Sequence, residues 1–153
     1  MKHRYFLLVP FLVAVGLFAA YAPQAGEIPP IPSAIVHGDP TEGQASLMNR
    51  LGDAGAQVEL GDPVGQDFFT VKGRIIKVNG MDVQVFEYAS LEAMEVDAAQ
   101  VSADGYSVGT SMISWMATPH FFKSDTMIVL YVGDDVTMTA LLESVLGAQF
   151  AGG

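Results

Sequence analysis

The stretch that decides the fold is FFTVKGRIIKVNGMDVQVFEY, Phe68 to Tyr88. It is rich in Val, Ile, Phe and Tyr on both sides of Asn79-Gly80, a pair that supplies the two positive-φ residues of a type I′ turn. The pattern predicts a β-meander whose two-residue hairpin turn fixes the strand register. In that register Lys77 faces Asp82, an opposite charge. The other predicted pairs are Ile76 with Val83, Val78 with Met81, and Gly73 with Phe86.

Length and composition indicate one domain with its own core. The chain has 153 residues, half of them apolar, and no cysteine, which excludes disulfides, thiolate metal sites and thiol nucleophiles. Two of the seven basic residues, Lys2 and Arg4, precede residue 27, which leaves five against 17 acidic residues and a net charge of −12. The five are scattered, so we expect no nucleic-acid partner.

Residues 1–26 have the pattern of an export signal. A short basic segment precedes the uncharged run Tyr5 to Ala22, which ends in small residues. Ala20-Tyr21-Ala22 fits a cleavage site, but Pro23 disfavours cleavage, so the segment is either a signal peptide or an uncleaved transmembrane anchor. Both alternatives predict an exported domain that is periplasmic, secreted or held at the outer face of the cytoplasmic membrane. Only an uncleaved segment would contact the membrane.

Residues 27–40 are predicted to be a proline-rich linker, followed by a single α+β domain over residues 41–153. Helices are predicted after the N-cap residues Thr41, Ser90 and Asp134-Asp135. Their expected buried stripes are Leu47, Met48, Leu51 and Ala54; Leu91, Met94, Ala98 and Val101; and Val136, Leu141, Leu142, Val145 and Leu146.

Further strands are predicted on either side of the second helix. The run MIVLYV is apolar at both parities, as expected of a central strand covered on both faces. The order is α-βββ-α-βββ-α, an antiparallel sheet packed by about three helices. The two halves represent either an internal duplication or only the general similarity of one hairpin to another. The predicted strands are Val58 to Leu60, ending at a turn over residues 61–63; Ser111 to Ala117; His120 to Lys123; and Thr126 to Val132, after a turn at Ser124-Asp125.

The phrases VNGMDVQVFEYAS, PHFFK, MIVLYVGDD and LGAQFAGG make the chain similar to an uncharacterised group of small bacterial exported proteins. The resemblance covers Leu51 to Gly153 and implies an extracytoplasmic domain at a membrane surface. Members of that group often look like lipoproteins, whereas no cysteine follows the apolar run here, which excludes a lipid anchor. The resemblance implies no activity and no catalytic residue.

Met112, Met116 and His120 are the candidate metal ligands. Two thioethers and an imidazole are soft groups that can hold Cu(I) in an exported protein, and the three residues share parity on an extended chain. Pro119 interrupts that geometry, and strand methionines usually pack in the core. Core packing is therefore the favoured interpretation, with His120 at a strand edge.

Other polar residues give weaker signals. His37 with Asp39 is a minimal metal pattern that we interpret as an exposed loop, and Asp134-Asp135 fits a helix cap better than paired catalytic carboxylates. No catalytic or cofactor-binding residue is assigned. A G-x-S-x-G elbow is missing around the candidate serine nucleophiles Ser111, Ser114 and Ser124.

The favoured function is a non-catalytic binding module that acts on a protein partner or a small ligand outside the cytoplasm. The alternatives are a periplasmic Cu(I)-binding protein and an enzyme whose site residues are dispersed. Exposed aromatics such as Phe68, Phe121 and Phe122 would indicate a partner surface. A concave pocket that gathers His120 with carboxylates would indicate a ligand site.

Overall fold

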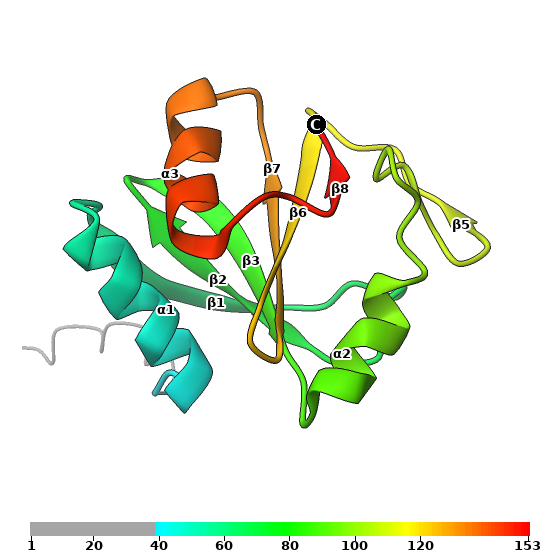
Figure 1. The fold of residues 1–153 in the computed structure, drawn as a ribbon, viewed down its shortest axis with the longest axis horizontal. Coiled ribbons are helices and arrows are strands. Elements are labelled where there is room, and N and C mark those ends of the chain that lie inside the picture. Colours follow the sequence, from blue (N-terminus) through cyan, green and yellow to red (C-terminus); the bar gives the residue numbers. More distant parts are fainter. Residues whose placement is uncertain (1–38) are drawn as a thin grey trace, which may run out of the picture. The chain divides into compact units, whose positions relative to one another are not determined.

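The structure is a computed structural model that describes residues 39–153 (Figure 1). The predicted export segment, most of the predicted linker and His37 lie outside the described residues. Within the described part, no helix has the length and apolar character needed to cross a membrane.

Three helices and a six-stranded antiparallel sheet form the domain, which confirms the α+β class (Figure 1). The strand order is β1-β2-β3-β7-β6-β8, with β4 and β5 paired in a separate two-stranded sheet. The helices are α1 (Glu42–Asp53), α2 (Leu91–Ala98) and α3 (Val136–Leu146). The strands are β1 (Val58–Val64), β2 (Gly73–Val78), β3 (Met81–Glu87), β4 (Ser107–Val108), β5 (Ser111–Met112), β6 (Pro119–Ser124), β7 (Met127–Val132) and β8 (Ala151–Gly152).

The β2–β3 hairpin has the predicted register. Asn79 and Gly80 have φ values of 51° and 82°, so both turn residues lie in the left-handed region. Lys77 is paired with Asp82, and their side chains approach to 2.6 Å. Gly73 lies opposite Phe86, and a Cβ at that glycine would come within 2.7 Å of the ring. The local turn chemistry therefore determines which side chains of both strands face the core.

Two of the predicted turns are misplaced. The expected turn over residues 61–63 is part of β1, which continues to Val64 with a register irregularity between Leu60 and Pro63. An edge strand tolerates a bulge and a proline, because its outer side makes no ladder hydrogen bonds. The other turn lies one residue later than predicted, at Asp125-Thr126. β8 was not predicted, because two residues carry no detectable periodicity.

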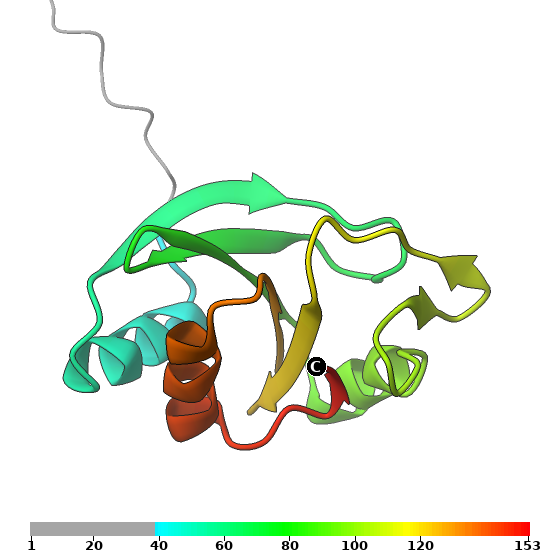
Figure 2. The same cartoon turned by 90° about the horizontal axis from the view of Figure 1, so that it is seen from above.

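The predicted strand Ser111 to Ala117 is also wrong, since only Ser111 and Met112 are extended and they pair with β4. The chain then leaves the strand path, and the Trp115 indole N–H donates to the Gly105 carbonyl at 2.8 Å. The β4–β5 hairpin projects away from α3 in both views (Figures 1 and 2). Between α2 and α3, only the β6–β7 hairpin joins the main sheet. The similarity between the two halves of the chain is therefore limited to one hairpin in each.

The sheet carries an apolar core on each face. One core packs α1 and α3 against β2, β3 and β7, and the other packs α2 against the opposite face. β7 lies between β3 and β6 and is buried on both faces, as MIVLYV predicted. Three stripe positions were wrong, because Ala54, Leu91 and Val136 are exposed. Ala54 is the C-cap of α1, and Leu91 and Val136 are each the first residue of their helix, so all three lie at helix ends.

Candidate functional site

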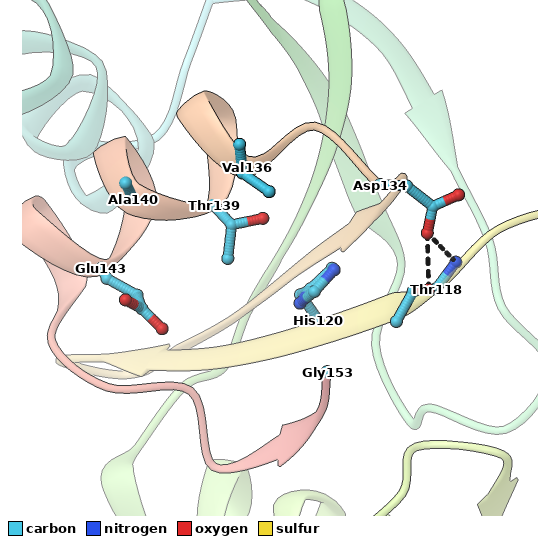
Figure 3. Close-up of a pocket in the computed structure, with 8 residues that line it drawn as sticks. All are labelled: Thr118, His120, Asp134, Val136, Thr139, Ala140, Glu143 and Gly153. Atoms are coloured by element: carbon cyan, nitrogen blue, oxygen red, sulfur yellow. Dashed lines mark hydrogen bonds between the residues drawn. The ribbon is translucent and has the colours of Figure 1, made fainter.

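A pocket with a volume of about 350 Å³ opens between α3 and the start of β6 (Figure 3). Three elements build it: the beginning of β6 with the residue before it, the loop between β7 and α3, and the exposed side of α3. The C-terminal end of the chain closes one side. The lining residues are Thr118, His120, Asp134, Val136, Thr139, Ala140, Glu143 and Gly153.

His120 forms the floor of this pocket. It pairs with Tyr131 of β7 on one side and Gly152 of β8 on the other, and strand alternation turns it toward α3, like Phe122 two residues later. Its ring stacks on Tyr131 at 5.8 Å between centroids and 20° between planes. Only 8% of the residue is exposed. His120 was predicted to lie at a strand edge; in the structure β8 covers that edge of β6.

Both ring nitrogens of His120 are engaged within the protein. Nδ1 lies 2.8 Å from Gln149 Oε1, and Nε2 lies 3.0 Å from the Gly133 carbonyl oxygen. The carbonyl can only accept, so Nε2 carries a proton. A doubly protonated ring can donate to both Gln149 Oε1 and the Gly133 carbonyl. A neutral ring would accept at Nδ1 from the Gln149 NH₂ group, if the amide is rotated by half a turn. In either state the ring is held in one orientation.

Asp134 supplies negative charge at the mouth of the pocket. It accepts hydrogen bonds from the Thr118 hydroxyl at 2.6 Å and from the Thr118 backbone N–H at 3.3 Å (Figure 3). The hydroxyl hydrogen bond, then the backbone one and, more weakly, the charge of His120 hold the pKa of Asp134 below its usual value. The carboxylate is therefore ionised at neutral pH.

The two adjacent aspartates have different roles. Asp135 is the N-cap of α3 and accepts from the Met138 backbone N–H at 2.9 Å, which confirms the predicted cap for that residue. Asp134 does not cap the helix and instead faces Thr118. The sequence pattern could not separate them, because either residue of the pair could have preceded the first turn.

The pocket offers both polar and apolar contacts to a ligand. Figure 3 shows His120 between Asp134 and Glu143, with Thr139 of α3 facing it. The polar groups are two acidic side chains and the hydroxyls of Thr118 and Thr139. The apolar contribution comes from α3, where Val136 is 81% exposed beside Ala140. This combination suits a small ligand with a positively charged end and a short apolar part.

The structure does not bring the predicted copper ligands together. Met112 is 91% exposed and Met116 is 101% exposed, so the expected core packing of both is wrong. Both belong to the β4–β5 hairpin and the loop after it, whereas His120 has both ring nitrogens engaged in the main sheet. In the part of the chain described here, no group of three His, Cys, Asp or Glu side chains could hold a metal ion.

The aromatic residues named as a partner surface are not one. Phe121 and Phe122 are fully buried on opposite faces of the sheet, because neighbouring strand residues alternate. Phe68 is half-buried and meets Trp115 edge-on at 6.0 Å.

Among the candidate serine nucleophiles, Ser124 accepts a hydrogen bond from Arg50 Nη2 at 2.8 Å, a contact that ties α1 to the end of β6.

A buried carboxylate was missed by the sequence analysis. Asp97 of α2 accepts from the Thr70 N–H and hydroxyl at 2.8 Å each and from the Tyr88 hydroxyl at 2.9 Å. Burial, and then the bond to Asp97, raise the pKa of Tyr88. These contacts attach the loop before β2 to α2, a structural role. The sequence did contain a signal for this buried carboxylate, because Asp97 follows Met94 by three residues and so lies on the buried face of its helix.

No protein-family model, curated protein or solved structure matches this chain. The resemblance that the sequence phrases carry therefore stays a prediction.

Proposed function

We propose that this domain is an extracytoplasmic binding module whose pocket over His120 takes a small organic cation, an ammonium group on a short apolar chain. The observation that carries the proposal is the pocket itself, in which a buried histidine lies between Asp134 and Glu143. A concave site that gathers His120 with carboxylates is the feature expected of a ligand-binding domain.

Size and charge support this class of ligand. A volume of about 350 Å³ is at the lower end of the range for small-molecule sites. Carboxylates accept charge-assisted hydrogen bonds from an ammonium group, and the surface formed by Val136 and Ala140 can contact methylene groups. The strongly acidic chain would repel anionic ligands and attract cations. His120 acts as a positioning residue, because both of its ring nitrogens are already engaged.

The test is a chemical-shift titration of the full chain with n-butylammonium, followed by backbone amide resonances. We expect saturable shifts at residues 118–120 and 133–143, the elements that line the pocket. The matched control is n-butyrate, which has a similar apolar chain and the opposite charge. Equal shifts with both probes, or shifts spread over the whole domain, would show that the pocket does not select a cation.

The location outside the cytoplasm is a separate part of the proposal and rests on residues 1–26. A periplasmic reporter enzyme fused after residue 40 should be active in a bacterial host. Activity that survives replacement of the apolar run Tyr5 to Ala22 by a polar sequence would count against export by this segment.

Copper binding stays a hypothesis of its own. With His120 held by Gln149 and Gly133, the sulfur ligands Met112 and Met116 would have to bind Cu(I) without it or draw it out of the sheet. A Cu(I) competition titration addresses this alternative. Sub-nanomolar affinity that is lost in His120→Ala, with the fold intact, would favour a copper site over the ammonium pocket.

A further inference from the structure

Among the methionines of residues 39–153, Met112 and Met116 are fully exposed, Met48 and Met81 are partly buried, and the other three are buried. The sequence has eight methionines and no cysteine. Met94, Met127 and Met138 are 1% exposed and belong to the two cores. Met112 and Met116, at 91% and 101%, stand in solvent. Of the methionines that the structure describes, these two are therefore the first that an oxidant meets at the folded domain, and the chain has no thiol to compete with them.

The segment that holds them does not depend on their side chains. Residues 105–118 carry no charge, and they are fixed by the pairing of β4 with β5 and by further hydrogen bonds, most of them to or from the backbone. The Ile113 N–H donates to the Tyr106 carbonyl at 2.9 Å, and the Trp115 indole donates to the Gly105 carbonyl. A methionine that contributes nothing to packing can change its chemistry without unfolding the domain.

We propose that Met112 and Met116 form a surface oxidation site that reacts with peroxides. A sulfur lone pair attacks one peroxide oxygen, the O–O bond breaks, and hydrogen peroxide yields methionine sulfoxide and water. The thioether is oxidised by two electrons and the peroxide is reduced by two. The product is polar where the side chain was apolar, and enzymes that reduce methionine sulfoxide can reverse the change. Oxidation would occur in β5 and the loop after it, whose residues Met112 and Met116 do not line the pocket over His120.

The experiment exposes the full-length protein to hydrogen peroxide and follows each methionine by peptide-mapping mass spectrometry. Sulfoxide should form at Met112 and Met116 about tenfold faster, or more, than at Met94, Met127 and Met138. In guanidinium chloride the five rates should become equal, which shows that the fold causes the difference. A smaller ratio in the folded protein overturns the proposal.

A variant pair separates the site from general oxidation. Replacing both Met112 and Met116 by leucine should remove the fast phase of sulfoxide formation, whereas Met48→Leu on α1 should leave it in place. Protein oxidised only at the two sites should keep the circular dichroism and thermal midpoint of the untreated chain. Loss of the fold at that stage would overturn the proposal, because it would mean that these side chains are part of the packing.

Discussion

His120 and Gln149 are joined by a 2.8 Å contact between Nδ1 and Oε1, which ties β6 to the segment that leads from α3 into β8. The other ring nitrogen meets the Gly133 carbonyl, in the loop that leads into α3. One side chain thus holds both the entry and the exit of α3 against the sheet. The pocket depends on this arrangement, because α3 forms its wall and His120 its floor.

The first prediction concerns the proton on His120. The Gly133 carbonyl can only accept a hydrogen bond, so the neutral ring should be the Nε2–H tautomer. Long-range ¹H–¹⁵N correlation spectra of the imidazole report the tautomer directly. A predominant Nδ1–H tautomer in the folded protein would show that the Gly133 contact does not hold in solution.

The second prediction compares stability at the three residues first considered as a metal set. His120→Ala should lower the free energy of unfolding by about 1 to 3 kcal/mol, because it removes a buried side chain and leaves its partly buried partners at Gln149 and Gly133 without their hydrogen bonds. Met112→Ala and Met116→Ala should change it by less than about 0.5 kcal/mol, since both side chains are exposed. Denaturant titration measures all three. The reverse order would place the methionines in a core.

The third prediction follows from the lowered pKa of Asp134. Because the folded pKa lies below the ordinary value of 3.8, ionised Asp134 contributes stability above that pH, and the contribution is lost as pH falls through the folded pKa. Thr118→Val removes the hydroxyl donor and should move the pKa of Asp134 back toward 3.8. Carboxyl ¹³C shifts followed against pH give this value.

Asp104 provides the internal control for that titration. Its pKa is lowered by hydrogen bonds from Ser102 and from the Tyr106 backbone, in the turn before β4. Thr118→Val should leave it unchanged. A common shift of Asp104 and Asp134 would point to a general change in the domain rather than to the loss of one hydroxyl.

The fourth prediction tests the hairpin. Gly80→Val should destabilise the domain by about 1 to 3 kcal/mol, because it forces a β-branched residue to φ 82°. A Cβ at Gly80 meets nothing within 4 Å, so the loss would come from the backbone and not from crowding. Asn79→Gly should be nearly neutral. Small and equal losses in denaturant titrations of the two variants would argue against the type I′ turn.

Local chemistry explains which parts of the fold were predictable. The Asn79-Gly80 turn, the N-caps Thr41 and Ser90 and the apolar run of β7 each act through neighbouring residues, so the sequence displays them. The segment after β5 was mistaken for a strand because it is rich in apolar residues, as buried strands are. In the structure the Trp115 indole donates to the Gly105 carbonyl and Met116 is exposed, a tertiary outcome that apolar composition does not encode.

The sequence identified one residue of the pocket but not the carboxylates that line it. His120 was identified as a residue of interest, but Asp134 and Glu143 come from other elements, and their meeting depends on how α3 packs against β6. Asp134 looked like a cap because it precedes a helix, although Asp135 takes that role. Asp97 shows the same limit, because its partners Thr70 and Tyr88 are distant in sequence and none of the three is informative alone.

The most direct test of the central claim is the affinity for n-butylammonium measured by isothermal titration calorimetry on the wild type and on a double variant, Asp134→Asn with Glu143→Gln. Loss of the charge-assisted hydrogen bonds should weaken binding about tenfold or more. The control is Asp53→Asn with Glu92→Gln, which removes two charges from α1 and α2, away from the pocket residues. The account predicts unchanged affinity in that control, and equal weakening in both double variants, or no binding by the wild type, would contradict it.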